Sequence, residues 1–525
     1  MYRPIKNKYF GGQVKLKNKN YLIIFIFITM PLFLFAVLSF SAKNANSANE
    51  SAPPYNAKIP NAVSGPFSRY FNPHALPNKA IIKYFPYQWL DAYLNTEHNT
   101  AVKISKKAPA WMRKGVGWKF PEARAWPLHY GNPYGIKIYG FRGAAPTQTQ
   151  YMGNALGVSV ANGIVYAESD DNFIYALNAK TGRLIWRNSP VENNLMGIPL
   201  VYHGLVFVSA GSVGFNFFQL VRYKEGKTPI RGAHISFNGI FALDALNGKL
   251  AWQRLTYGEQ MASPAIHKGI LFYATGNSKV YAVNALTGKT VWVSHVRGVD
   301  NMSNPAYYKG RIFVSFAFPN HLYCLNAATG RLIWQTTIPG ATNTGMGDVS
   351  PAVSRGIIVM DAVAYPKIIN DKKTVQTILA AFSSGSGKIL WIKKEGRGLM
   401  PPAFKGSVPM IHNGIVYSGN PANSTYQARN LYTGKLLWLW KIPNPGPAGA
   451  GRGNPTYYNG RLYISQSKYI YVLNPKNGKL IGKAYIGGRM GIVNPVIIGG
   501  TVYLSNSWDW IVAKPLRSII IKKHK

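Results

Sequence analysis

The segment "LYCLNAATGRLIWQ", Leu322 to Gln335, decides the fold because the chain repeats it. Including this segment, the chain contains seven copies, and the last of them, "IYVLNPKNGKLIG", ends at Gly482 instead of tryptophan. The turn glycines of successive copies are 40 to 66 residues apart, a spacing typical of four-stranded propeller blades. Five further near-copies end in tryptophan, at Trp186, Trp252, Trp292, Trp391 and Trp438.

One full period predicts four short strands. In "SPAIHKGILFYATGNSKVYAVNALTGKTVW", strands are expected up to Ile266, up to Ala274, from Val280 to Asn284, and up to Trp292. The Asn-Ala-Leu-Thr-Gly turn combines an Asn side chain that bonds nearby amides with a glycine that adopts positive φ. The tryptophan is expected to pack between neighbouring blades, which is a structural role.

The last blade needs a strand from the start of the chain. The segment from Asn494 to Leu516 has inner-strand patterns but no Thr-Gly-Lys closing strand. Residues around Val116 to Tyr139 are expected to supply it, because pairing the chain ends removes exposed sheet edges. The sequence therefore predicts an all-β, eight-bladed propeller over residues 116–516, with an N-terminal signal or anchor helix.

The N-terminus indicates export. Residues 1–20 are basic, Tyr21 to Phe40 is an apolar run, and small polar residues follow. We expect a signal peptide or signal-anchor with its linker over residues 1–52, then an N-terminal extension over 53–115 and a basic tail over 517–525. Cleavage near Ser39/Ser41 or Ala45/Ser47 is favoured, with membrane anchoring as the alternative. The expected location is the periplasm or the outer cell surface.

The charge balance indicates an acidic environment. The chain has 60 Lys and Arg against 17 Asp and Glu, a formal charge of +43. The basic residues are dispersed through turns and no nucleic-acid-binding module is evident, so we expect no nucleic-acid partner. The shortage of acids is more informative than the number of bases. A protein exported into acid has this composition.

Asparagine occupies the turn position where such repeats commonly carry aspartate. Among the repeats, aspartate occupies this turn position only at Asp244. A carboxylate that accepts hydrogen bonds from backbone amides stabilises the fold by about 2 to 3 kcal/mol per group, and this stabilisation is lost as pH falls through the folded pKa. The side-chain amide of asparagine accepts the same hydrogen bonds and does not titrate. The hypothesis is that the fold works near or below about pH 4; the alternative is that Asn simply tolerates turns. The five asparagines are Asn178, Asn284, Asn326, Asn430 and Asn474.

The single cysteine excludes several chemistries. Cys324 replaces an alanine of other copies at a small inward position, so we expect a buried core residue. A disulfide framework and thiol catalysis are both disfavoured.

The repeat "YALNAxTGxLxW" resembles the pyrroloquinoline quinone (PQQ) type propeller repeat from about Val158 to Leu516. That family includes quinoprotein dehydrogenases, outer-membrane assembly scaffolds and the tetrathionate hydrolases of acidophilic sulfur oxidisers. The dehydrogenases typically carry a vicinal disulfide and a Ca²⁺ site, which one cysteine and few acids do not provide. Length, export signal and basicity resemble the tetrathionate hydrolases, so no PQQ, Ca²⁺ or other cofactor is expected. A PQQ-dependent dehydrogenase and a non-catalytic scaffold of the outer-membrane assembly type remain the alternatives.

A second repeated phrase places the chemistry. Connections between blades end in proline at the start of an inner strand, as in "GEQMASP", "VDNMSNP", "NTGMGDVSP" and "GGRMGIVNP". If these connections share one face, they bring acids and arginines to the propeller mouth, although the methionines can simply plug the centre. The residues brought together are Glu259, Asp300, Asp348, Arg452 and Arg489.

Asp348 is the first candidate catalytic residue. Its glycine-rich surroundings let a ligand approach closely, and the resemblance to tetrathionate hydrolases implies an aspartate at the propeller mouth. Asp300 and Asp361 are the other candidates.

The resemblance implies hydrolysis of a sulfur–sulfur bond in tetrathionate to thiosulfate, sulfate and sulfur. Arg452, Arg489 and Arg397 are expected to bind the anionic ends of this substrate, with Glu259 nearby; the alternative for each arginine is a solvated loop charge. Asp348, with a pKa near the acidic working pH, would protonate the leaving sulfur or activate water. No metal is required.

Two insertions, over residues 209–239 and 361–376, lengthen connections between middle strands. Phe215, Phe217 and Phe218 in the first suggest a homodimer surface, but a lid or local packing would use the same residues.

Overall fold

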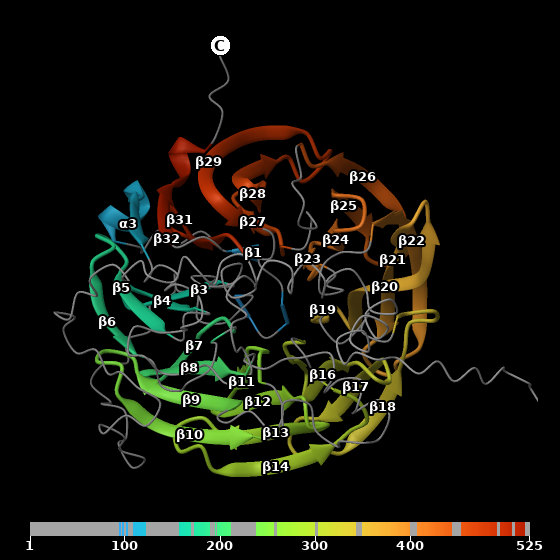
Figure 1. The fold of residues 1–525 in the computed structure, drawn as a ribbon, viewed down its shortest axis with the longest axis horizontal. Coiled ribbons are helices and arrows are strands. Elements are labelled where there is room, and N and C mark those ends of the chain that lie inside the picture. The colour runs from blue at the N-terminus through green and yellow to red at the C-terminus, as the bar shows by residue number, and fades with distance from the viewer. Residues whose placement is uncertain are drawn as a thin grey trace, which may run out of the picture.

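The strands form a closed ring of blades. The computed structural model describes residues 94–95, 97–98, 101–102, 109–121, 157–169, 173–188, 195, 197–211, 238–256, 260–299, 303–342, 349–399, 407–443, 453–490, 494–506 and 510–519. Within these residues, eight four-stranded sheets are arranged around a common axis (Figure 1). The predicted eight-bladed propeller is confirmed. The predicted N-terminal helix lies outside the described residues, and none of the helices that are described is both long and apolar enough to cross a bilayer.

The first four blades have the same order of strands, from the inner edge to the outer edge. Blade 1 contains β3 (Val158–Ala161), β4 (Ile164–Glu168), β5 (Ile174–Asn178) and β6 (Leu184–Asn188). Blade 2 contains β7 (Leu200–Tyr202), β8 (Leu205–Ala210), β9 (Asn238–Asp244) and β10 (Leu250–Thr256). Blade 3 contains β11 (Ala265–His267), β12 (Ile270–Thr275), β13 (Lys279–Asn284) and β14 (Thr290–His295). Blade 4 contains β15 (Ala306–Tyr308), β16 (Arg311–Phe316), β17 (His321–Asn326) and β18 (Leu332–Thr336).

The other four blades include two variations. Blade 5 contains β19 (Ala352–Ser354), β20 (Ile357–Ile369), β21 (Lys372–Ser383) and β22 (Ile389–Leu399). Blade 6 contains β23 (Met410–His412), β24 (Ile415–Asn420), β25 (Thr425–Asn430) and β26 (Leu436–Lys441). Blade 7 adds β1 (Ala101–Val102) to β27 (Thr456–Tyr458), β28 (Arg461–Leu473) and β29 (Leu480–Met490). Blade 8 contains β30 (Val496–Ile498), β31 (Thr501–Asn506), β32 (Trp510–Pro515) and, at its outer edge, β2 (Trp118–Pro121).

The ring closes with a strand from the start of the chain, as the sequence predicts. β2 pairs antiparallel with β32, and Trp118 lies opposite Ala513. The indole nitrogen of Trp118 donates a hydrogen bond to the Ala179 carbonyl of blade 1, at 3.0 Å. The two ends of the propeller are therefore held by a shared sheet and by a contact between the last and first blades.

The repeated phrase is a joint between blades. The Asn326 side chain accepts the amides of Ala328 and Thr329, which forms the turn before Gly330. Gly330 has φ +73°, and the ring of Trp292 from the preceding blade packs against it so closely that a Cβ atom would lie 2.6 Å from the ring. Trp292 also donates a hydrogen bond to the Ala327 carbonyl, at 3.0 Å. Six other joints repeat this contact, pairing Trp118 with Gly182, Trp186 with Gly248, Trp252 with Gly288, Trp334 with Gly387, Trp391 with Gly434 and Trp438 with Gly478.

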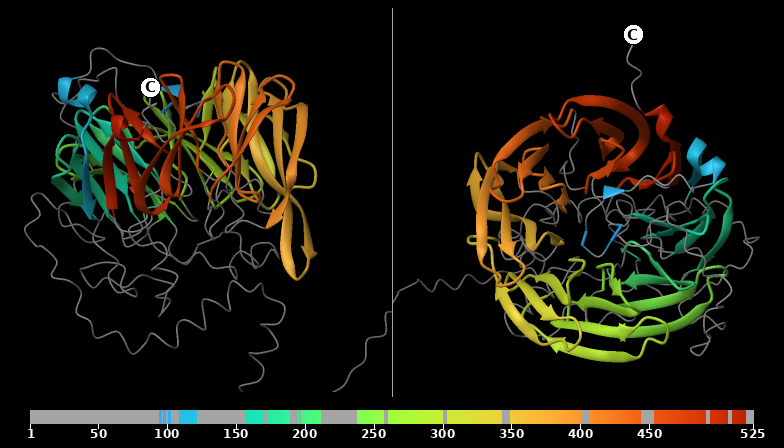
Figure 2. Two further views of the ribbon diagram at one scale, coloured as in Figure 1. Left: turned by 90° about the horizontal axis from the view of Figure 1, so that it is seen from above. Right: turned by 180° about the vertical axis from the view of Figure 1, so that it is seen from behind.

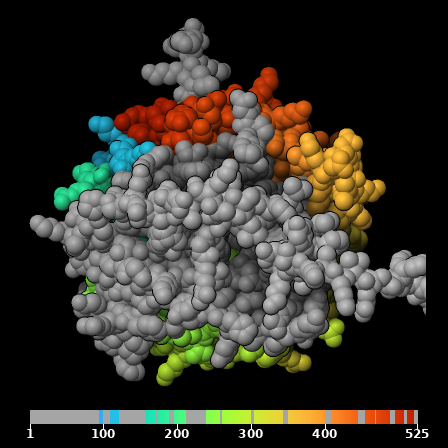
Figure 3. Space-filling view, in the orientation of Figure 1, coloured from blue at the N-terminus to red at the C-terminus, as the bar shows by residue number. Residues whose placement is uncertain are grey.

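The propeller has two distinct faces. In blades 1 to 6, the turn between the first and second strands and the turn between the third and fourth strands lie at the same end, which we call the turn face. These two turns are hydrogen-bonded to each other, as the Ala327 amide is to the Gly310 carbonyl at 2.9 Å. The connections from each blade to the next lie at the opposite end, the loop face. The long hairpin of β20 and β21 extends beyond the other strands on that side (Figure 2). In the space-filling view, described residues of blades 2, 3, 5 and 7 are visible at the rim (Figure 3).

The N-terminal extension enters the centre of the ring. Val353 of β19 donates its amide to the Glu97 carbonyl at 3.0 Å, and β1 pairs in parallel with β27, which places both near the axis (Figure 1). Helix α3 (Ala110–Lys114) then lies at the turn face, where Gly500 donates its amide to the Met112 carbonyl at 2.7 Å. Because β27 runs from the loop face to the turn face, the extension passes along the axis in that direction before it forms β2.

The core lies between the blades. Each hydrophobic cluster joins side chains of adjacent sheets, such as Phe272 and Val280 of blade 3 with Ile312 and Val314 of blade 4. Cys324 is fully buried, as predicted, and burial raises the pKa of its thiol to about 12.

The joint between blades can be tested by comparing two glycines. Gly330 and Gly310 have φ of +73° and +77°, but the space beside Gly310 is open. Gly310→Ala should lower the free energy of unfolding by about 1 kcal/mol through its backbone conformation. Gly330→Ala should lower it by about 1 to 3 kcal/mol more, because its Cβ must displace Trp292. Urea denaturation followed by tryptophan fluorescence measures both; equal losses would contradict this account of the joint.

Candidate active site at the loop face

The connections between blades end in a ring of prolines at the loop face. Each proline precedes an inner strand, so the repeated phrase recognised in the sequence begins every inner strand from blade 2 to blade 8. These prolines are Pro199, Pro264, Pro305, Pro351, Pro409, Pro455 and Pro495.

Hydrogen bonds tie successive connections to one another. At four of these prolines, the preceding residue donates its amide to the side chain at the same position in the next blade, as Ile198 does to Ser263 Oγ at 2.6 Å. Ser263 donates to Asn304 Oδ1 at 2.9 Å, and Asn304 donates to Ser350 Oγ at 2.9 Å. Asn454 and Asn494 repeat the bond at 3.2 Å. The connections therefore converge around the axis, as the sequence predicts, and their ends are fixed there.

Most of the predicted site residues lie outside the described residues. This applies to Glu259, Asp300, Asp348 and Arg452. Arg489 lies in β29, and nothing is described of its side chain.

The described residues on either side of Asp300 and Asp348 are bonded to blades 4 and 5. Val299, before Asp300, pairs with Ala317. Thr342 donates its amide to the Val363 carbonyl at 2.8 Å, and the Val349 carbonyl accepts the Ser315 hydroxyl at 2.6 Å. The segments that carry both aspartates therefore start and end at the loop face of blades 4 and 5.

Arg397 lies on the long hairpin of blade 5. Its guanidinium donates to the Tyr365 carbonyl at 2.8 Å and to Thr374 Oγ1 at 3.2 Å. These bonds bind it to the hairpin. Its role in substrate binding stays a prediction.

Asp361 is fully buried in β20, near the loop face. One carboxyl oxygen, Oδ2, accepts the Ser407 amide at 3.0 Å, and the other, Oδ1, has no hydrogen-bond partner within the described part of the chain. Ser407 lies at the end of the connection to blade 6, so Asp361 holds this connection. Burial raises the pKa of Asp361 to about 8.

Glu168 is the counterpart of Asp361 on the opposite side of the ring. Both are the fifth residue after the glycine of the first turn of their blades, blades 1 and 5. Glu168 Oε2 accepts the amides of Gly197 at 3.0 Å and Ser209 at 3.2 Å, and burial raises its pKa. At the same position the other blades have Ser209, Ala274, Ser315, Gly419, Ser465 and Ser505.

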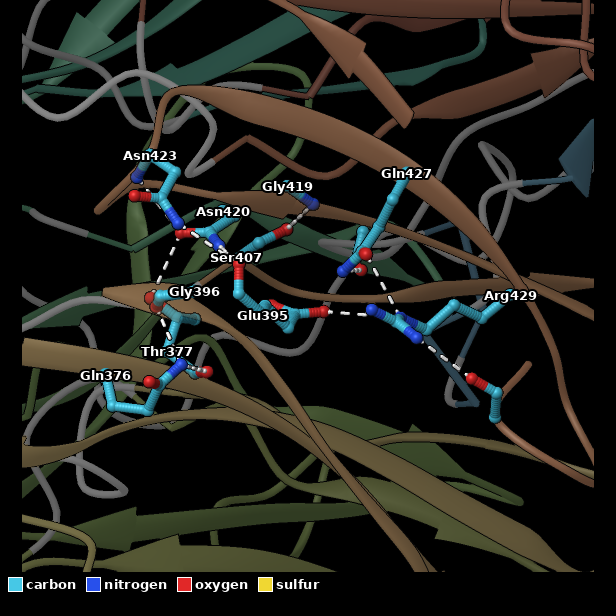
Figure 4. Close-up of polar contacts among 12 residues, drawn as sticks. Gln376, Thr377, Glu395, Gly396, Ser407, Gly419, Asn420, Asn423, Gln427 and Arg429 are labelled. Carbon is cyan, nitrogen blue, oxygen red and sulfur yellow. Dashed lines mark hydrogen bonds and ion pairs between the residues drawn. The ribbon is translucent and has the colours of Figure 1, made fainter. Parts of the chain in front are cut away.

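A second buried carboxyl group lies close to Asp361. Glu395 comes from β22, where the pairing with β21 shifts register, and its side chain is only 1% exposed. Its Oε1 lies 3.7 Å from Nε of Arg429 in blade 6, and the two side chains point toward each other (Figure 4). Burial and the repulsion of Asp361 raise the pKa of Glu395, which Arg429 opposes.

Amide and hydroxyl groups surround this cluster of Asp361, Glu395 and Arg429. Asn420 and Asn423 both donate to the Glu395 carbonyl at 3.1 Å (Figure 4). Arg429 donates to Gln427 Oε1 at 3.0 Å and to the Gly434 carbonyl at 2.9 Å. The two buried carboxyl groups repel each other and Arg429 faces Glu395, so at least one of the carboxyl groups stays protonated over a wide pH range.

The sequence analysis missed Glu168, Glu395 and Arg429. Glu168 could have been found from the sequence, because at the equivalent position most of the other blades have Ser, Ala or Gly. Glu395 was not, because the register shift that turns it inward has no sequence signature. Among the described residues, no group of three or more His, Cys, Asp or Glu side chains is placed to hold a metal ion.

The chain is similar to known proteins over most of its length. The sequence profile of the family described as outer membrane protein assembly factor BamB matches residues 142–315 and 298–517. A tetrathionate hydrolase from Acidithiobacillus ferrooxidans is 52% identical over 462 residues, covering 88% of this chain and 92% of that protein. A tetrathionate hydrolase from Acidianus ambivalens is 39% identical, covering 83% and 85%.

Solved structures show the same fold. BamB from Moraxella catarrhalis superposes with a TM-score of 0.51 at 16% identity, over 69% of this chain and 96% of that one. A quinohemoprotein alcohol dehydrogenase from Pseudomonas putida HK5 gives 0.52 at 12% identity, over 83% and 81%.

The buried acids predict a fold that is more stable in acid. Between about pH 4 and 8 folded Asp361 keeps a proton that the unfolded chain loses, so the free energy of unfolding should fall as pH rises through this window. Glu168 and Glu395 act in the same direction.

Asp361→Asn should flatten this dependence by a few kcal/mol between about pH 4 and 8, since it removes one titrating group and its repulsion of Glu395. Urea denaturation at several pH values measures the slope. Asp371→Asn, at the exposed end of the long hairpin, is the control and should leave the slope unchanged. A wild-type protein more stable at pH 8 than at pH 4 would contradict the prediction.

Proposed function

The chain belongs to the tetrathionate hydrolase family within the PQQ-like propeller repeats, and we propose that it hydrolyses tetrathionate at its loop face. One tetrathionate and one water give one thiosulfate, one sulfate, one sulfur atom and two protons, which balances atoms and charge. The observation that carries this proposal is the identity of 52% along almost the whole length of a tetrathionate hydrolase.

Asp348 is the proposed catalytic residue, with Asp300 as the alternative on a neighbouring connection. The fixed chain around each of them, at Val349 and at Val299, supports a site between blades 4 and 5. The aspartate would move a proton between water and the leaving sulfur atom. Asp361 fits this role less well, because its carboxyl group is fully buried and bonded to Ser407.

The proposed substrate contacts are arginines. Tetrathionate carries a negative charge at each end, and planar guanidinium groups bind such oxyanions through paired hydrogen bonds. Arg452 and Arg489 are proposed for this role, with Glu259 beside them. Arg397 would have to exchange its bonds to the hairpin for bonds to the substrate.

The proposed reaction uses neither a metal nor an organic cofactor. Water supplies the only new atoms in the products, and the proton transfers suit a carboxyl group whose pKa is matched to an acidic working pH.

The proposal extends to location and assembly. The basic and apolar N-terminal segment supports export to the periplasm or the outer cell surface, or membrane association through that segment. A homodimer is proposed, and the exposed Ile368 and Ile369 on the long hairpin offer an apolar surface for it. A purified chain that sediments as a monomer would contradict the homodimer.

Hydrolysis can be tested directly. The purified chain should release thiosulfate from tetrathionate with a maximum at acidic pH, and Asp348→Asn should lower kcat by about 10² to 10⁴-fold. Asp371→Asn is a control that removes an exposed acid elsewhere and should keep full activity.

Other outcomes are equally informative. Full activity of Asp348→Asn would assign the chemistry to Asp300 or Asp361, and the variants Asp300→Asn and Asp361→Asn then decide between them. A folded chain that is inactive at every pH, or that carries a bound quinone with dehydrogenase activity, would contradict the proposed function.

A further inference from the structure

The N-terminal extension contacts blades on several sides of the axis. Leu94 packs against the hydrophobic cluster shared by blades 8 and 1. Glu97 bonds β19 of blade 5, and Ala101 and Val102 pair with β27 of blade 7. The extension is therefore an integral part of the centre of the ring.

Among the described residues of this extension, His98 is the most buried polar residue, with 1% of its surface exposed. Its Nδ1 lies 2.6 Å from the Pro351 carbonyl oxygen, and the Pro305 carbonyl is a second acceptor beside the ring. A neutral imidazole carries one N–H and donates to one of these carbonyl groups, whereas the ring protonated in acid can donate to both. The imidazole thus bridges the inner strands of blades 4 and 5. Burial lowers the pKa of His98 to about 4, although both carbonyl groups oppose this shift.

The backbone holds His98 in an unusual conformation. His98 has φ +60°, its amide bonds to the Asn95 carbonyl at 3.0 Å, and the Glu97 amide bonds to Asn95 Oδ1 at 3.1 Å. A positive φ is uncommon for a residue other than glycine, and here it directs the ring toward the two prolines. A residue that only fills space would need neither this turn nor two carbonyl partners.

The two carbonyl groups belong to the connections of the proposed site. Pro305 follows Asp300 by five residues, and Pro351 follows Asp348 by three. The same connections are joined a second time by the bond from the Asn304 amide to Ser350 Oγ. His98 therefore fixes the distance between the ends of the two segments that carry the candidate aspartates.

We propose that His98 is a positioning residue for the hydrolysis: by its contacts with the Pro305 and Pro351 carbonyl groups, it sets the relative position of the two connections that bear Asp300 and Asp348. This inference rests on the proposed function. It gives the N-terminal extension a role in the proposed site that is separate from the closure of the propeller by β2.

Two variants and one control separate positioning from space filling. His98→Phe keeps an aromatic ring but removes the ring nitrogens that face the two carbonyl groups. His98→Gly removes the ring, suits the positive φ, and leaves space in which added imidazole can bind. His412→Phe is the control, because His412 ends the inner strand of blade 6 and stacks on Tyr457, at 4.0 Å between ring centroids.

Activity is the first readout. His98→Phe should lower kcat for tetrathionate by about tenfold or more with a smaller change in KM, because misplaced groups bind substrate but react slowly. His98→Gly should lose activity similarly and regain several-fold on addition of imidazole. His412→Phe should stay within about twofold of wild type. Full activity of His98→Phe would overturn the proposal.

Hydrogen exchange is the second readout and does not depend on turnover. The amides of Asn304 and Val353, which bond Ser350 and Glu97, should exchange about tenfold faster in His98→Phe than in wild type or His412→Phe. Unchanged exchange at both amides would overturn the bridging role. A wild-type chain that does not hydrolyse tetrathionate would contradict the proposed function, and the exchange result would still decide whether His98 joins the two connections.

Discussion

The packing of one tryptophan on the turn glycine of the next blade is the constraint on which the structure depends. The glycine must adopt positive φ and leave room for the indole ring, and the indole nitrogen must reach a carbonyl of the turn before it. In five of the joints an asparagine side chain forms that turn. These requirements explain why the chain repeats one phrase. Blade 7 departs from the rule at Gly482, and its joint to blade 8 uses a bond from the Tyr458 hydroxyl to the Gly499 carbonyl, at 2.8 Å, together with an apolar cluster.

The electrostatics of the fold follow from the distribution of its few acids. Glu168, Asp361 and Glu395 are among only 17 acidic residues, yet all three are buried. A buried carboxyl group is most easily accommodated when it is protonated, so acid favours the folded state at these positions. Five of the turns that hold the blades together use asparagine, which does not titrate, and Asp244 is the exception. The interior and the turns are therefore suited to the same acidic range.

The sequence was sufficient for most of the fold because each blade repeats a local pattern. The strands, the joint tryptophans and the closing strand near Trp118 are all found where the repeat indicates, since hydrophobic alternation and turn residues act over short distances. The burial of Cys324 followed from comparison of the copies. The candidate site was only partly predictable. The proline-ended connections do converge, but the pairing of Glu395 with Arg429 depends on a register shift, and the contact of His98 with Pro351 joins residues 253 positions apart. Neither leaves a periodic signal.

The passage of the N-terminal extension along the axis has a consequence for how the ring is built. Leu94, His98 and β1 contact blades on different sides of the ring, so residues from outside the repeats lie at its middle. A toroidal fold is easily pictured as blades that contact only their two neighbours. Here blades that are not adjacent in the ring also share a partner, because one short segment touches blade 1, blade 5 and blade 7.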